Sequence, residues 1–108
     1  MNEILKIPFA VFDNDWDDLQ LFLKHRGNPP YEINDDLNLF GSKIKSLGNL
    51  TSVGGSLDLR KSKIEDLGNL TSVGGWLDLR NTLLSKKYSE KEIRSMVKIE
   101  RNIYLNTI

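Results

Sequence analysis

The hydrophobic and polar positions of this chain return in the same pattern every 20 residues. Residues 42–60 read SKIKSLGNLTSVGGSLDLR and residues 62–80 read SKIEDLGNLTSVGGWLDLR, so sixteen of the nineteen aligned positions are identical. Residues 56–60 alternate polar and apolar, which predicts a short strand with Leu57 and Leu59 facing inward and the polar residues facing outward. Stacked repeats of this kind place leucine on leucine at a strand spacing of about 4.8 Å.

The same frame extends beyond the two matched repeats. Leu37 and Leu39 occupy the leucine positions of an earlier repeat, and Ile103 and Leu105 occupy those of a later one. The later repeat matches only if six residues are inserted after Leu84. An apolar β-branched residue lies four positions before the first leucine in three repeats, at Ile33, Val53 and Val73.

Glycine and asparagine mark two corners in each repeat. The pairs Gly54-Gly55 and Gly74-Gly75 precede the predicted strands, where we expect a sharp turn that uses positive φ angles. Gly48-Asn49 and Gly68-Asn69 mark a second corner, and Asn34-Asp35 replaces the glycine pair in the first repeat.

Both ends of the repeat region carry helical patterns. Residues 15–26 predict an amphipathic helix whose apolar face holds Trp16, Leu19, Phe22 and Leu23. Ser89 and Glu92 form a capping-box pattern that opens a second helix over residues 89–98, with Ile93, Met96 and Val97 facing inward. Because stacked repeats need covered ends, we expect these helices to be caps.

The repeat pattern L-x-L-x-x-[ST]-x-I-x-x-L-x-N-L-x-x-V-G-G resembles leucine-rich repeats, especially the short-coil form of receptor L domains, over residues 31–105. It is also similar to uncharacterised short-coil repeat proteins of phages and bacteria. Each repeat lacks an obvious convex helix. We therefore expect a mainly β, right-handed leucine-rich-repeat-like β-solenoid of about three 20-residue coils with N-terminal and C-terminal helical caps. It forms one domain over residues 1–108, with a cap segment at 1–30, coils at 31–84, and an insertion, cap helix and closing strand at 85–108.

Composition narrows the possible functions. Lysine plus arginine equals aspartate plus glutamate at 15 each, which gives no general attraction to nucleic acid or to an anionic membrane. Lys43, Lys45, Lys61 and Lys63 cluster loosely, but Glu65 and Asp66 interrupt the basic positions one repeat on. No cysteine is present and the N-terminal residues lack a long apolar run, so we expect a cytoplasmic protein with no signal peptide or membrane span.

The sequence offers little material for catalysis or metal binding. His25 is the single histidine, and with no cysteine it cannot complete a zinc site or a nucleophile–histidine pair. Residues 13–18 resemble the start of a calcium loop, but Asp18 and Lys24 stand where glycine and glutamate are needed. We therefore expect a protein with no enzymatic activity, no cofactor, no metal and no small-molecule substrate.

The outward positions of the four predicted strands form a grid of polar, charged and aromatic residues that could bind a partner. Its rows are Asp36, Asn38, Phe40; Ser56, Asp58, Arg60; Trp76, Asp78, Arg80; and Asn102, Tyr104, Asn106. Trp76 stands where the sister repeat has Ser56, so the repeat itself does not require tryptophan. Aromatic and arginine side chains together are typical of interface hot spots. The other interpretation is that Trp76 is a local plug or stacks on Arg80.

The sequence therefore predicts a non-catalytic, monomeric protein-binding module. The expected partner contacts are Trp76, Arg80, Arg60, Asp58, Asp78, Phe40 and Tyr104. Asp58 and Asp78 are expected to be neutralised by Arg60 and Arg80 rather than to act as a catalytic pair. Two alternatives stay open: a structural component of a virion or cell-surface assembly, and a phage-encoded inhibitor or regulator of a host protein. The insertion at 85–92 is the alternative binding site.

Overall fold

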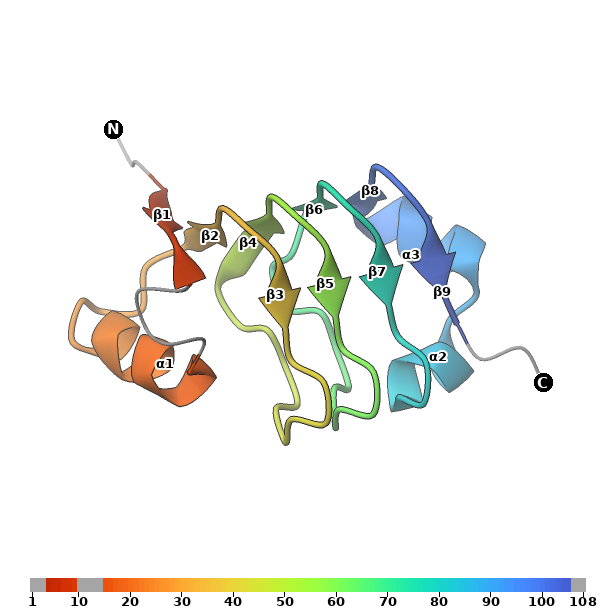
Figure 1. The fold of residues 1–108 in the computed structure, drawn as a ribbon, viewed down its shortest axis with the longest axis horizontal. Coiled ribbons are helices and arrows are strands. Elements are labelled where there is room, and N and C mark those ends of the chain that lie inside the picture. The colour runs from red at the N-terminus through yellow and green to blue at the C-terminus, as the bar shows by residue number, and fades with distance from the viewer. Residues whose placement is uncertain (1–3, 10–14, 106–108) are drawn as a thin grey trace.

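The computed structural model describes residues 4–9 and 15–105, and these residues form two parallel sheets and three helices (Figure 1). The five-stranded sheet has the order β1 (Leu5–Ile7), β2 (Tyr31–Ile33), β4 (Leu50–Val53), β6 (Ser72–Val73) and β8 (Lys98–Ile99). The four-stranded sheet has the order β3 (Leu37–Asn38), β5 (Leu57–Asp58), β7 (Leu77–Asp78) and β9 (Ile103–Tyr104). The helices are α1 (Trp16–Lys24), α2 (Leu83–Lys87) and α3 (Glu90–Met96).

The predicted fold class, a right-handed leucine-rich-repeat-like β-solenoid of about three coils, is wrong. The described residues form a small α/β protein with sheets of five and four parallel strands. The prediction assigned one strand to each repeat and treated Val53 and Val73 only as anchors before a corner. In the structure these residues lie in strands that pair with each other, and β1 from the N-terminal segment extends the same sheet. None of the described helices is long and apolar enough to cross a membrane.

Residues that are 20 positions apart in the sequence pair with each other on neighbouring strands. Leu57 pairs with Leu77, and the amide of Leu57 donates to the carbonyl oxygen of Trp76 at 2.9 Å. Leu57, Leu59 and their equivalents at 37, 39, 77 and 79 are buried, so the predicted inward positions are confirmed. The later repeat is also confirmed, because Leu77 pairs with Ile103.

Glycine is needed in these pairs for a different reason from the predicted one, which was a positive φ angle. Gly54 and Gly74 do not have positive φ; among the described glycines, positive φ occurs only at positions 27, 41, 48 and 68. A Cβ atom on Gly74 would collide with the backbone carbonyl oxygen of Gly54, and one on Gly54 would collide with that of Asn34. Glycine is therefore required here because neighbouring turns stack backbone on backbone.

The two predicted helices are present, although α3 ends at Met96. Asp15 caps α1 by accepting from the amides of Asp17 and Asp18, and Leu19 and Leu23 are buried beneath the helix. Trp16 and Phe22 are half-buried against the same core, as the apolar face predicted. At the other end Ile93 and Val97 are buried, but Met96 is 50% exposed, so its predicted inward position is wrong. The insertion also forms α2, which the sequence pattern did not predict.

The α3 capping box provides a first test of the fold. Ser89 Oγ accepts from the Glu92 amide at 3.2 Å, and Glu92 Oε1 accepts from the Ser89 amide at 3.0 Å. We expect Ser89→Ala to lower the free energy of unfolding by about 1 kcal/mol, because it leaves an amide of the first turn without this partner. Chemical denaturation would measure the change against Lys91→Ala, an exposed position in the same helix that should change by less than about 0.5 kcal/mol. Equal values for the two variants would contradict the capping role.

Candidate interaction surface

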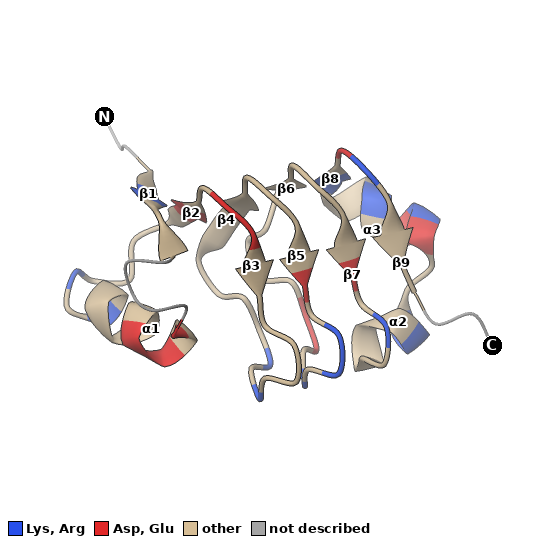
Figure 2. Ribbon diagram, in the orientation of Figure 1, with Lys and Arg blue, Asp and Glu red and all other residues tan. Residues whose placement is uncertain are grey.

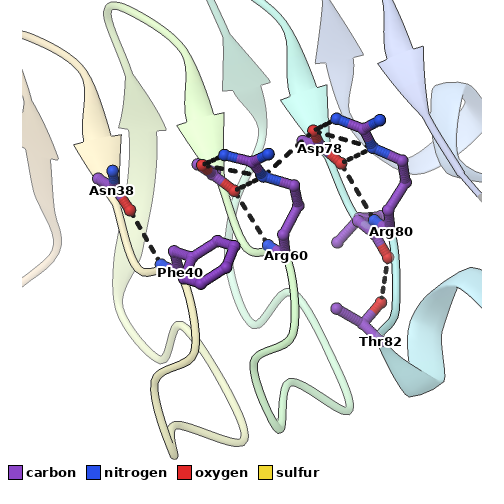
Figure 3. A network of polar contacts seen from close by, with 8 residues as sticks. Asn38, Phe40, Arg60, Asp78, Arg80 and Thr82 are labelled. Carbon is purple, nitrogen blue, oxygen red and sulfur yellow. Dashed lines mark hydrogen bonds and ion pairs between the residues drawn. The ribbon is translucent and has the colours of Figure 1, made fainter.

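The outward side of the four-stranded sheet carries the predicted contact residues. We call this surface the strand face and define it by Phe40, Arg60, Trp76, Arg80 and Tyr104. Figure 3 shows Arg60 joined by hydrogen bonds and ion pairs to the aspartates of β5 and β7, with Arg80 on Asp78, while Asn38 at β3 contacts only the Phe40 amide. The face is thus continuous from one repeat to the next.

Asp58 and Asp78 are buried on this face, and their predicted contact with a partner stays a prediction. They are only 4% and 2% exposed, because the arginine two residues along each strand folds back over its carboxylate. Arg60 donates from Nε to Asp58 Oδ1 at 3.0 Å and from its terminal nitrogen to Oδ2 at 2.7 Å. Arg80 repeats these contacts to Asp78 at 3.0 and 2.6 Å. The expected neutralisation by arginine is confirmed, and the aspartates act by positioning the arginines.

The two arginine–aspartate pairs also form a row across the strands. Arg60 Nε lies 3.6 Å from Asp78 Oδ2, so Arg60 contacts the aspartates of both repeats. Burial alone would raise the pKa of Asp58, but the hydrogen bonds and charge of Arg60, together with the charge of Arg80, hold that pKa below its ordinary value. The guanidinium groups are therefore held in fixed orientation, while 39% and 46% of the Arg60 and Arg80 side chains stay exposed.

The two aspartates also accept hydrogen bonds from backbone amides. Asp58 Oδ1 accepts from the Arg60 amide at 3.0 Å, and Asp78 Oδ1 accepts from the Arg80 amide at 3.1 Å. Asn38 takes this position in the first repeat and accepts from the Phe40 amide at 3.0 Å. A side-chain oxygen thus accepts from the backbone after β3, β5 and β7, and it belongs to an aspartate in the two repeats where an arginine follows.

Aromatic side chains occupy both ends of the arginine row. The Phe40 ring is 49% exposed, and the Arg60 guanidinium carbon lies 5.1 Å from its centroid. At the other end, the rings of Trp76 and Tyr104 meet edge to face at 6.2 Å. Arg80 lies over the Tyr104 ring at 5.4 Å. Among the described contacts Trp76 therefore packs on Tyr104, and the arginine predicted to stack on it stacks on its neighbour instead.

The remaining grid positions are structural or undescribed. Asp36 Oδ1 accepts from the Ser56 amide at 2.7 Å, and Ser56 Oγ accepts from the Trp76 amide at 3.0 Å. These side chains tie adjacent turns together. Asn102 donates to the Tyr104 hydroxyl at 3.4 Å, and Asn106 lies outside the described residues.

Two hollows that are lined in part by α2 were not predicted. One is a depression of about 370 Å³ below the ends of β5 and β7, lined by Lys61, Lys63, Lys86, Leu83, Asn81 and Thr82 among others. The other is an apolar cavity of about 230 Å³, which Leu67, Leu70, Leu84, Ile93 and Val97 help to line where α2 and α3 meet the repeats. Residues of α2 help to line both hollows. The sequence could not predict these hollows, because a five-residue helix is too short to show a hydrophobic period.

The described residues contain no group of three or more histidine, cysteine or acidic side chains placed to hold a metal ion. In the calcium-like segment, residues 13 and 14 lie outside the described part, and Asp15 is engaged as the α1 cap. His25 is exposed at the C-terminal end of α1.

A scan against protein-family models and searches of curated proteins and solved structures found no match. The resemblance to leucine-rich repeats stays a prediction from the sequence.

Proposed function

We propose that this chain is a non-catalytic protein-binding module that uses the strand face. The observation that carries the proposal is the Trp76–Tyr104 pair beside Arg80. Trp76 is half-buried and Tyr104 is 38% exposed, so both rings still offer surface to a partner. The sister repeat has Ser56 in place of Trp76 and keeps the same strand register, so the tryptophan is not needed to form the strand.

The fixed arginines add to this proposal. An arginine held by a buried aspartate loses little rotamer freedom on binding, because its orientation is already set. Hot spots in protein interfaces are rich in tryptophan, tyrosine and arginine, and these three residue types meet here. The proposed contacts are Trp76, Tyr104, Arg60, Arg80 and Phe40, with Asp58 and Asp78 in positioning roles. A monomeric, cytoplasmic protein is part of this proposal.

The test is Trp76→Ser, which restores the residue of the sister repeat. After affinity capture has identified a partner, titration should show binding about 30-fold weaker than that of the wild type, because losing an aromatic anchor costs about 2 kcal/mol. The melting temperature should change little. Leu21→Ser is the matched control, since Leu21 is 55% exposed on α1 and lies outside the strand face.

Other outcomes would redirect or end the proposal. Unchanged affinity in Trp76→Ser would move the binding site to the insertion at 85–92. Loss of folding in Trp76→Ser would show that the tryptophan is a structural plug.

A structural role in a larger assembly is the second candidate, and the position of β9 favours it. This strand is the last in the order of the four-stranded sheet, so its outer edge faces no other described strand. Open edges can pair with strands of another chain. Sedimentation over a range of concentrations distinguishes the candidates, because an assembly component should self-associate and a lone binding module should stay monomeric.

A further inference from the structure

The end of the strand face beyond Arg60 and Arg80 is strongly basic. Figure 2 shows lysine and arginine in the turns after β5 and β7 and on α2, while acidic residues lie at the start of α1, before β3, at the ends of β5 and β7, and on α3. The depression of about 370 Å³ described above lies in this basic region and is lined by Lys61, Lys63 and Lys86. None of its lining residues, all of them in the described part, is acidic.

The contacts of the three ammonium groups leave room for a ligand, since Lys61 Nζ lies 5.7 Å from the centroid of the exposed Phe40 ring and none of the three groups has an ion pair among the described residues. Among the described ion pairs, lysines take part only through Lys45 and Lys98, and neither lines the depression. Leu83 lies at the same depression and is 58% exposed, which adds apolar surface to the cationic one. Such a surface fits a partner with negative charge and some apolar character.

The backbone at Lys61 gives an independent indication. Lys61 has φ 58°, a left-handed conformation that lysine rarely adopts. The equivalent positions in the neighbouring repeats are Gly41 at φ 69° and Asn81 at φ 61°, which are the residue types that suit this conformation. A lysine kept at a strained position points to a role for its charge rather than for its conformation.

We propose that the depression binds carboxylates of an acidic protein segment, and that this segment belongs to the partner that contacts the strand face. This inference rests on the proposed function. The depression follows directly after β5 and β7, so a segment lying along these strands can reach both the lysines and the Trp76–Tyr104 pair. Arg60 and Arg80 lie between the two regions, with their aspartate contacts already made.

An acidic protein fits this surface better than a nucleic acid does. Nucleic-acid binding draws on many unpaired cations, whereas Arg60 and Arg80 are already neutralised by buried aspartates. Single-stranded nucleic acids also bind by stacking bases on open aromatic rings. The Tyr104 ring is covered by Arg80 on one side and meets the edge of Trp76, so it is a poor platform for stacking.

The first measurement uses the full chain and a short glutamate peptide. Backbone amide shifts in a titration should move around residues 61–63 and 81–86, and the affinity should fall as salt is added. A glutamine peptide of equal length should not bind. Absence of binding by the glutamate peptide at low salt would overturn the proposal, and so would tighter binding of a single-stranded oligonucleotide of equal charge at the same residues.

Variants then assign the site. Lys61→Asn installs the residue type of the next repeat, and it should weaken peptide binding about three-fold while the melting temperature stays the same or rises. Lys86→Gln should also weaken binding about three-fold, and the double variant about ten-fold. Lys91→Gln is the control, because it removes the same charge from α3, away from the depression. Unchanged peptide affinity in the double variant would overturn the proposal.

The outcome is separable from that of the proposed function. With the captured partner, Trp76→Ser tests the strand face and the double lysine variant tests the acidic segment. If only Trp76→Ser weakens the binding of the partner, the proposed function stands and this inference fails. If the double lysine variant weakens it as well, both stand. If neither variant weakens it, the partner binds elsewhere and both fail.

Discussion

Gly74→Ala should lower the free energy of unfolding by about 3 kcal/mol, although it adds only one methyl group. The added Cβ would collide with the carbonyl oxygen of Gly54 in the preceding turn. Because the obstacle is backbone, no rotamer change relieves it, and the turns must separate. Separation would disturb the hydrogen bond from the Gly74 amide to the Val53 carbonyl oxygen, which is 2.8 Å long.

Gly48→Ala is the matched control for this stacking effect. Gly48 has φ 59°, and a Cβ placed on it would meet nothing within 4 Å. Its substitution should therefore cost only the conformational strain, about 1 kcal/mol. Urea denaturation of both variants would measure the difference. If Gly48→Ala cost as much as Gly74→Ala, conformation rather than stacking would explain the glycine pairs.

The glycine pairs also show what sequence reasoning could reach. The 20-residue repeat correctly gave the inward leucines, the register between Leu57 and Leu77, and the register of the later repeat. It could not show which property of glycine was used at positions 54 and 74. Positive φ and absence of a side chain predict the same residue, and only the position of the neighbouring turn distinguishes them.

The second sheet was missed for a related reason. Alternation is a strong signal at Leu57 and Leu59, but β6 has two residues and β1 has three, too few for a period. Strand β1 pairs with β2 although α1 lies between them in the sequence. No local sequence pattern predicts the pairing of strands that are so far apart in the chain. The fold class was therefore wrong even though most inward positions were right.

At the candidate site, the sequence identified the outward positions but not their burial. Alternation places Asp58 and Asp78 on the side opposite the leucines. It does not show that Arg60 and Arg80 fold back to cover them. The lysine depression was missed because it joins the turns after β5 and β7 with α2, segments that only the fold brings together.

The buried carboxylate of Asp58 leads to the second large effect. Asp58→Ala should lower the free energy of unfolding by about 3 kcal/mol at neutral pH. The substitution removes the acceptor of three donors of Arg60, namely its amide, its Nε and its terminal nitrogen. Because 39% of the Arg60 side chain is exposed, water can replace part of the loss, and the cost stays at the lower end for broken buried ion pairs.

Asp58→Asn separates the charge of this residue from its turn-forming role. Asparagine already serves at the equivalent position of the first repeat, where Asn38 accepts from the Phe40 amide at 3.0 Å. The variant should therefore keep the turn and lose only the ion pair, with a cost of about 1–2 kcal/mol at neutral pH. A cost equal to that of Asp58→Ala would show that the ion pair, and not the turn, carries the whole effect.

The difference between wild type and Asp58→Asn should also depend on pH. The pKa of Asp58 in the folded chain is below its ordinary value, since Arg60 and Arg80 more than offset the effect of burial. A carboxyl with a lowered folded pKa stabilises the fold above its unfolded pKa, and this contribution is lost as the pH falls through the folded pKa. Denaturation from about pH 6 down to about pH 2 should show the wild type losing its advantage over Asp58→Asn. A constant difference across this range would mean that Asp58 titrates alike in the folded and unfolded chains, and that the arginine row does not stabilise its charge.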